Sequence, residues 1–102
     1  MKTKEIKLVE LPKTLKIHSQ DKQMPWQDAM DYAASIGMRL PTKFELQAIA
    51  ESTDEFNDLG WAWSSSTYSY DSTYAWYVYL DYGSTDISYV KTYTRSVLCV
   101  SP

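Results

Sequence analysis

Histidine and cysteine, which act in many enzyme and metal sites, occur only once each in this chain of 102 residues, and glycine occurs only three times. The single cysteine, Cys99, excludes a disulfide within the chain. One histidine with one cysteine also argues against a zinc site, which draws on several such ligands. No glycine-rich loop of the phosphate-binding type occurs. We therefore expect no cofactor and no metal.

Long hydrophobic runs and a basic excess are absent as well. No stretch approaches the roughly 18 apolar residues of a membrane-spanning helix, and no apolar run follows residues 1–5, so neither membrane insertion nor a signal peptide is predicted. Ten basic side chains stand against thirteen acidic ones, for a net charge of -3. Because nucleic-acid-binding domains usually carry a basic face, no nucleic-acid partner is expected. The length indicates a single domain over residues 1–102.

Charge is uneven along the chain. Residues 1–26 carry six lysines against three acids, whereas residues 27–60 carry seven acids against two basic side chains. We interpret this as a basic arm that packs against, or is solvated beside, an acidic helical face. An RNA-binding arm is the weaker alternative.

Periodicity predicts the first half of the fold. Residues 4–18 alternate as strands do, so we expect two short strands there, or one strand broken near a proline that cannot donate to the ladder. Helices are predicted over 25–36, ending before Gly37, and from Thr42 to residue 51 or 52. Thr42 and Glu45 form a capping box, in which each side chain accepts from the other residue's backbone.

The second half is predicted to be β. After an acidic loop at 53–60, strands are expected at 61–65, 75–80, 87–90 and 96–100, with a hairpin turn at 81–84. Trp76, Val78 and Leu80 should face the core, because they alternate with Tyr77 and Tyr79, which face the surface or a groove. The last strand should be buried and pair with the N-terminal one.

Aromatic side chains are abundant between residues 61 and 93, which hold eight tyrosines and three tryptophans among Ser, Thr and Asp. Tyrosine gives broad amphipathic contact at low entropic cost, and small polar residues add adaptable hydrogen bonds, as in antibody paratopes. Strands also favour tyrosine, so Tyr77 or Tyr79 should pack on a neighbour. The others are predicted to be mostly exposed: Tyr68, Tyr70, Tyr74, Tyr82 and Tyr89.

Several short motifs follow one another along the chain after the end of the first predicted helix. They are Arg39-Leu40-Pro41-Thr42-x-x-Glu45-Leu46, Trp63-Ser64-Ser65-Ser66, Ala75-Trp76-x-Val78, Gly83 and Val97-Leu98-Cys99-Val100. This order, over about residues 24–100, resembles the C-terminal domain of collagen-like adhesins (the Lcl type). The resemblance implies an α+β, C-type lectin-like fold with two helices packed on small antiparallel sheets and paired terminal strands. Residues 39–45 are also similar to formylglycine-generating and sulfatase-modifying enzymes.

Differences between this chain and these families exclude some of the functions that the resemblance would otherwise imply. The adhesin-related domains often carry a cysteine where this chain has Ala33, so Cys99 has lost its mate and is expected to be a buried small hydrophobe. The formylglycine-generating enzymes use paired cysteines, which this chain cannot supply. The sugar-binding calcium site of true C-type lectins needs Glu-Pro-Asn or Gln-Pro-Asp and Trp-Asn-Asp triplets, and none occurs. Arg39 is expected to pair with an acid or with loop carbonyls, with a ligand role as the alternative.

Other chemical sites are weakly indicated. A catalytic triad would require His18 near one of the serines at 64–66. Asp71, Asp81 and Asp86 could bind calcium through loop oxygens, but the Asp-x-Asp-x-Asp spacing is missing.

The sequence therefore predicts a non-enzymatic, calcium-independent binding module of a phage or bacterium. Its partner is expected to be a protein, in the narrower version a host protein that a small phage-encoded chain modulates or inhibits. The alternative is an adhesin or virion component that binds carbohydrate without calcium. The expected location is the cytoplasm, of the host cell if phage-encoded, with the virion or cell surface as alternatives. The predicted contact residues are Trp61, Tyr68, Tyr70, Asp71, Tyr74, Tyr82 and Tyr89.

Overall fold

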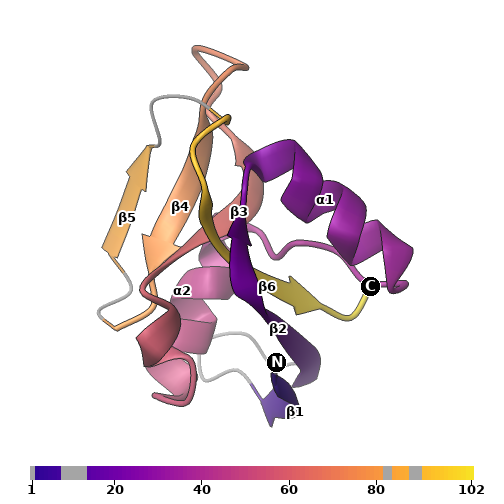
Figure 1. Cartoon of the computed structure of the whole chain (residues 1–102). Coiled ribbons are helices and arrows are strands. Elements are labelled where there is room, and N and C mark those ends of the chain that lie inside the picture. The colour runs from indigo at the N-terminus through magenta and orange to yellow at the C-terminus, as the bar shows by residue number, and fades with distance from the viewer. Residues whose placement is uncertain (1, 8–13, 82–83, 88–90) are drawn as a thin grey trace.

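A computed structural model describes residues 2–7, 14–81, 84–87 and 91–102 (Figure 1). Within these ranges, two α-helices, one short 3-10 helix and six strands follow one another. They are β1 (Lys2–Lys7), β2 (Thr14–Met24), α1 (Trp26–Ser35), α2 (Lys43–Ser52), η1 (Asn57–Leu59), β3 (Trp61–Thr67), β4 (Ala75–Tyr79), β5 (Ser84–Ile87) and β6 (Arg95–Val100).

The strands form a sheet in the order β1-β2-β6-β3-β4-β5. Neighbouring strands run antiparallel, except that β3 and β6 are parallel where Ala62 pairs with Ser96. The C-terminal strand β6 thus lies inside the sheet and pairs with β2, with Ile17 opposite Val100. The expected pairing of N-terminal and C-terminal strands is confirmed, and it closes the domain (Figure 1).

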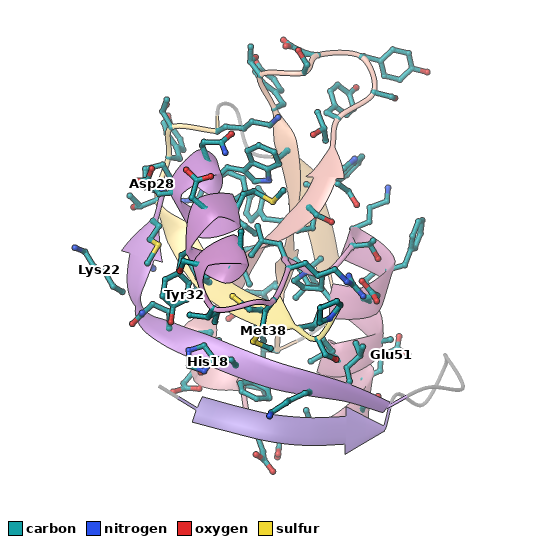
Figure 2. All side chains as sticks on the ribbon, turned by 90° about the vertical axis from the view of Figure 1, so that its right-hand side faces the viewer. His18, Lys22, Asp28, Tyr32, Met38 and Glu51 are labelled. Carbon is teal, nitrogen blue, oxygen red and sulfur yellow. The ribbon has the colours of Figure 1, made fainter. Side chains whose placement is uncertain are left out.

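Both faces of the sheet are covered, because α1 and α2 pack on opposite sides (Figure 2). Alternate residues of β6 point to opposite faces of the sheet. Leu98 and Val100 belong to the hydrophobic cluster on the α2 side, and Val97 and Cys99 belong to the cluster on the α1 side. The α2-side cluster is Leu15, Ile17, Leu46, Ala48, Ile49, Phe56, Ala62, Val78, Leu80, Leu98 and Val100. The α1-side cluster is Ala29, Ala33, Leu40, Trp63, Ala75, Val97 and Cys99.

Helix boundaries follow the local signals. The backbone of Gly37 has a φ of 71°, the left-handed conformation expected after α1. At α2 the capping box is present: Thr42 Oγ1 accepts from the Glu45 N–H at 3.2 Å, and Glu45 Oε1 accepts from the Thr42 N–H at 2.9 Å. The Arg39 guanidinium adds a two-pronged ion pair to the same carboxylate, at 2.7 and 2.8 Å, which is the acid partner that was expected.

Several details differ from the sequence prediction. The second of the expected short strands, β2, continues to Met24 instead of ending near residue 18. The acidic loop at 53–60 contains the helix η1 and buries Phe56, because a single large apolar side chain among acids gives no periodic signal. The strand expected at 87–90 is β5, at 84–87, and residues 88–90 lie outside the described part, as do residues 82–83 of the predicted turn. Trp76 is half-buried and belongs to neither core cluster.

Candidate binding surface

The segment between β3 and β4, residues 68–74, is closed by its own backbone; we call it the β3–β4 loop. The Tyr68 N–H donates to the Tyr74 carbonyl at 3.0 Å, and the Tyr74 N–H donates to the Asp71 carbonyl at 3.1 Å. A further bond, at 3.3 Å, runs from the Asp71 N–H to the Tyr68 carbonyl. The loop projects from the end of the sheet (Figure 1). The loop backbone is therefore held in place by its own hydrogen bonds.

Asp71 shapes the tip of this loop. Its Oδ1 accepts from the Thr73 N–H at 3.0 Å and from the Thr73 hydroxyl at 2.7 Å, the local turn that aspartate commonly makes. These two hydrogen bonds favour the ionised carboxylate and lower the pKa of Asp71. The Thr73 carbonyl accepts from the Lys91 N–H at 2.9 Å, which ties the tip to the segment before β6. Asp71 thus sits in the predicted surface, with its carboxylate oriented by the turn.

Tyrosine rings gather around Tyr68. Its ring centroid lies 5.4 Å from that of Tyr70, 6.4 Å from that of Tyr74 and 5.8 Å from that of Trp76. Tyr70 is 86% exposed, as predicted. Tyr68 and Tyr74 are half-buried, which corrects the prediction that they are mostly exposed, because their rings stack on one another and Tyr68 also packs on Trp76. The loop therefore presents one free ring on a support of fixed ones.

Trp76 links these rings to α2. The Nζ of Lys43 lies 3.9 Å from the Trp76 ring centroid and 5.1 Å from the centroid of Phe44, which is 65% exposed. Trp76 shares a sheet face with Val78, as predicted, but at this end of β4 a lysine covers it instead of the core. We call the continuous set Lys43, Phe44, Tyr68, Tyr70, Tyr74 and Trp76 the aromatic face.

Three members of the aromatic face, Lys43, Phe44 and Trp76, were not among the predicted contact residues, and Trp76 was expected to face the core. Phe44 lies two positions before Leu46, on the side of α2 away from the buried stripe. A large apolar side chain on the wet side of an amphipathic helix is the signal that could have identified it. The placement of Lys43 depends on tertiary contact with β4, so no local pattern indicates it.

A serine run fixes the base of the loop to the start of α2. The register of β3 and β4 shifts between Trp63 and Thr67, and the buried Ser64 hydroxyl bridges the gap by donating to the Trp76 carbonyl at 2.8 Å. The Ser65 N–H donates to the Pro41 carbonyl at 2.7 Å, and the Lys43 N–H donates to Ser66 Oγ at 3.2 Å. The Leu-Pro-Thr and Trp-Ser-Ser-Ser motifs are therefore in direct contact, and together they hold the two halves of the aromatic face.

A second aromatic group lies on the opposite face of the sheet. Trp61 is half-buried, with its ring centroid 4.7 Å from that of Tyr77 and 4.9 Å from that of Tyr79. The Arg95 guanidinium lies 4.7 Å from the Tyr77 centroid and 5.7 Å from that of Tyr93, which is 47% exposed. Both Tyr77 and Tyr79 thus pack on a neighbour, as expected of at least one of them.

The predicted contact residues therefore divide. Tyr68, Tyr70, Asp71 and Tyr74 come together in the β3–β4 loop, whereas Trp61 lies with the second group. The two groups are on different sides because Trp61 pairs with Tyr79 across the ladder, and Tyr79 alternates with the core-facing Val78. Tyr82 and Tyr89 lie outside the described residues.

Another lysine lies over a tryptophan on the α1 side. The Nζ of Lys91 is 3.8 Å from the Trp26 ring centroid and donates to Thr67 Oγ1 at 3.3 Å. Partial burial disfavours the charged form and lowers the pKa of Lys91. Trp26 is itself fixed, because its Nε1–H donates to the Ser64 carbonyl at 2.9 Å.

The side chains considered for catalysis have structural partners. His18 Nε2 lies 2.9 Å from the Tyr32 hydroxyl, where α1 crosses β2 (Figure 2). Ser64, a serine considered as a nucleophile, donates its hydroxyl to a backbone carbonyl. Burial raises the pKa of the Cys99 thiol to about 11, so little nucleophilic thiolate exists near neutral pH. No group of His, Cys, Asp and Glu side chains in the described ranges has the geometry of a metal site.

Two helices on a sheet whose terminal strands pair, with irregular connections at one end, define a C-type lectin-like α+β fold. The chain is similar to the solved structure of TC14, a C-type lectin from the tunicate Polyandrocarpa misakiensis. The TM-score is 0.61 at 17% sequence identity, over 86% of this chain and 98% of the other. This likeness shows the fold.

Comparison of the sequence with known families and curated proteins gives no match. The resemblances to Lcl-type adhesins and to sulfatase-modifying enzymes therefore stay predictions. Among the residues that the structure describes, no helix is long and apolar enough to cross a membrane.

Proposed function

We propose that this chain is a non-enzymatic binding module that recognises a protein partner through the aromatic face. The observation that carries the proposal is the presentation of Tyr70, whose ring is 86% exposed on a loop closed by its own backbone hydrogen bonds. Aromatic side chains are enriched in protein interfaces and contribute much of the binding energy there.

Rigidity of the loop supports this proposal. Binding costs free energy for every side chain and loop that must be ordered. Here the Asp71–Thr73 turn and the rings around Tyr68 already hold the loop, so that cost is small. Within the described residues no pocket opens at the surface. An extended contact with a protein suits such a face better than a small enclosed ligand does.

A second candidate is calcium-independent binding of carbohydrate, as by an adhesin or virion component. The TC14 protein is named a lectin, and Tyr70 offers an open ring face on which a sugar could stack. The two candidates differ in what the same exposed ring contacts. A glycan array distinguishes them, because the protein-binding proposal predicts no glycan signal that depends on Tyr70.

The proposal is tested by affinity capture from host-cell lysate with mass spectrometry. The baits are the unchanged protein, Tyr70→Ala and Tyr93→Ala. Tyr93 is the matched control, since it is also an exposed tyrosine but belongs to the second aromatic group. We expect one protein to be retained by the unchanged bait and by Tyr93→Ala and to be lost on Tyr70→Ala.

Equal capture of that protein by Tyr70→Ala would contradict the assignment of the site. The narrower version of the proposal, a phage-encoded modulator or inhibitor, is tested by the identity of the captured protein and by its activity with and without this chain. Thermal unfolding of both variants checks that each still folds, as expected for exposed side chains.

A further inference from the structure

Lys43 is the only cation in the aromatic face, and its ammonium group is held without an acid. Its Nζ lies between two rings, 3.9 Å from the Trp76 centroid and 5.1 Å from that of Phe44. Among the described residues, Lys43 Nζ makes no hydrogen bond or ion pair. The acid closest along α2, Glu45, is engaged by Arg39 at 2.7 Å. A positive charge is thus fixed at the surface with its donors unused.

Aromatic rings position this charge but do not neutralise it. Attraction between an ammonium and a ring face leaves the three N–H donors able to bond an anion. Lysine normally loses much side-chain freedom when it forms an ion pair, which makes surface pairs weak. The rings of Trp76 and Phe44 have already restricted Lys43, so an arriving anion meets a lower entropic cost.

Apolar contact surrounds the charge. Phe44 is 65% exposed on one side of Lys43. On the other side, Trp76 leads through Tyr68 to the exposed ring of Tyr70, by centroid distances of 5.8 and 5.4 Å. A ligand matched to this order of groups has a negative charge with an apolar group on each side.

Resting on the proposed function, we propose that Lys43 anchors a carboxylate of the protein partner. The partner segment carries an Asp or Glu flanked by aromatic or aliphatic side chains. The carboxylate accepts from Lys43 Nζ, one apolar neighbour packs on Phe44, and the other packs on Tyr68 and Tyr70. A single charge between two apolar contacts fits a protein segment better than an extended polyanion, which the net charge of -3 would repel.

A peptide selection tests this assignment with a defined probe. A random dodecapeptide phage-display library is selected on the immobilised full chain, and the enriched sequences are counted for Asp and Glu next to apolar residues. We expect such acid–apolar sequences to be enriched. Synthetic versions of the selected peptides should bind more weakly as salt rises, because an exposed ion pair is screened.

Variants of Lys43 test whether its ammonium group binds the carboxylate of the selected peptides. Lys43→Gln should weaken the selected peptides about tenfold or more, the loss expected for one charge-assisted hydrogen bond. Lys43→Arg should retain binding, since a guanidinium also stacks on aromatic rings. Lys22→Gln is the control: it removes an exposed lysine of β2, which lies outside the aromatic face, and should leave affinity unchanged.

The outcomes separate this inference from the proposed function. Peptides that lose affinity on Tyr70→Ala but carry no excess of acids, or that bind Lys43→Gln as tightly as the unchanged protein, would overturn the carboxylate assignment alone. Failure to select any peptide sensitive to Tyr70→Ala would overturn both. The backbone N–H of residue 43, which donates to Ser66, is retained in Lys43→Gln, so an unchanged melting temperature is expected and is measured alongside.

Discussion

Tyr68 and Tyr70 are two positions apart in the chain but have different roles. Tyr70 is free at the tip of the loop, whereas Tyr68 is half-buried and supports the rings of its neighbours. Composition predicted that tyrosines in this stretch form a contact surface, and Tyr70 is exposed as expected. Which ring supports and which is free could not be predicted, because it depends on how the loop folds back to join Tyr68 to Tyr74.

Cys99 gives a prediction at the scale of one residue. Burial in β6 raises the pKa of its thiol to about 11 from an ordinary 9.0. At about pH 8 the native thiolate fraction should be about a hundredfold below that of the unfolded chain, and burial also blocks access. We expect a thiol reagent to modify Cys99 slowly in the native protein and rapidly in denaturant. Equally fast modification in both states would contradict its buried placement.

Raising the pH should lower the free energy of unfolding through the same thiol. The folded state prefers the neutral thiol, so this preference stabilises the protein fully below about pH 9 and is lost as pH rises toward about 11. Cys99→Ala serves as the control. The difference between the unchanged protein and this variant in how stability depends on pH is the part due to the thiol.

At the scale of elements, Arg39, Thr42 and Glu45 lock the start of α2. Glu45 is almost fully buried and accepts from both the cap backbone and the guanidinium, while Arg39 keeps 37% of its side chain exposed. The capping box was predictable, because all its parts lie within four residues. The ladder shift between Trp63 and Thr67 was not predictable, since its stability depends on a hydroxyl of Ser64 reaching a neighbouring strand.

This lock predicts an order of stabilities in urea unfolding. Thr42→Ala should lower the free energy of unfolding by about 1 kcal/mol, the usual cost of losing a cap. Glu45→Ala should cost more, because it removes the other half of the box and the partner of Arg39. Solvent screening on the exposed side of Arg39 limits the ion-pair part. A Glu45→Ala variant as stable as the unchanged protein would show that the capping box and the Arg39–Glu45 ion pair do not stabilise the start of α2.

Considered as a whole molecule, the chain packs one helix on each face of its sheet, and the β3–β4 loop projects from one end (Figure 1). Terminal-strand pairing and helix count were predictable from periodicity and from the motif order. The division of the aromatic residues into two groups was not, because it depends on which side of β3 and β4 each ring occupies. Trp61 and Trp76 lie in the same stretch of sequence, yet their strand positions place them on opposite faces.

Mapping of the contact by NMR tests the central claim most directly. Amide chemical shifts of the labelled 11.8 kDa chain are compared before and after addition of the protein partner obtained by affinity capture. If the partner binds the aromatic face, the largest changes fall at residues 43–44 and 68–76. Largest changes at Trp61, Tyr79 and Arg95, with the aromatic face unaffected, would contradict the claim.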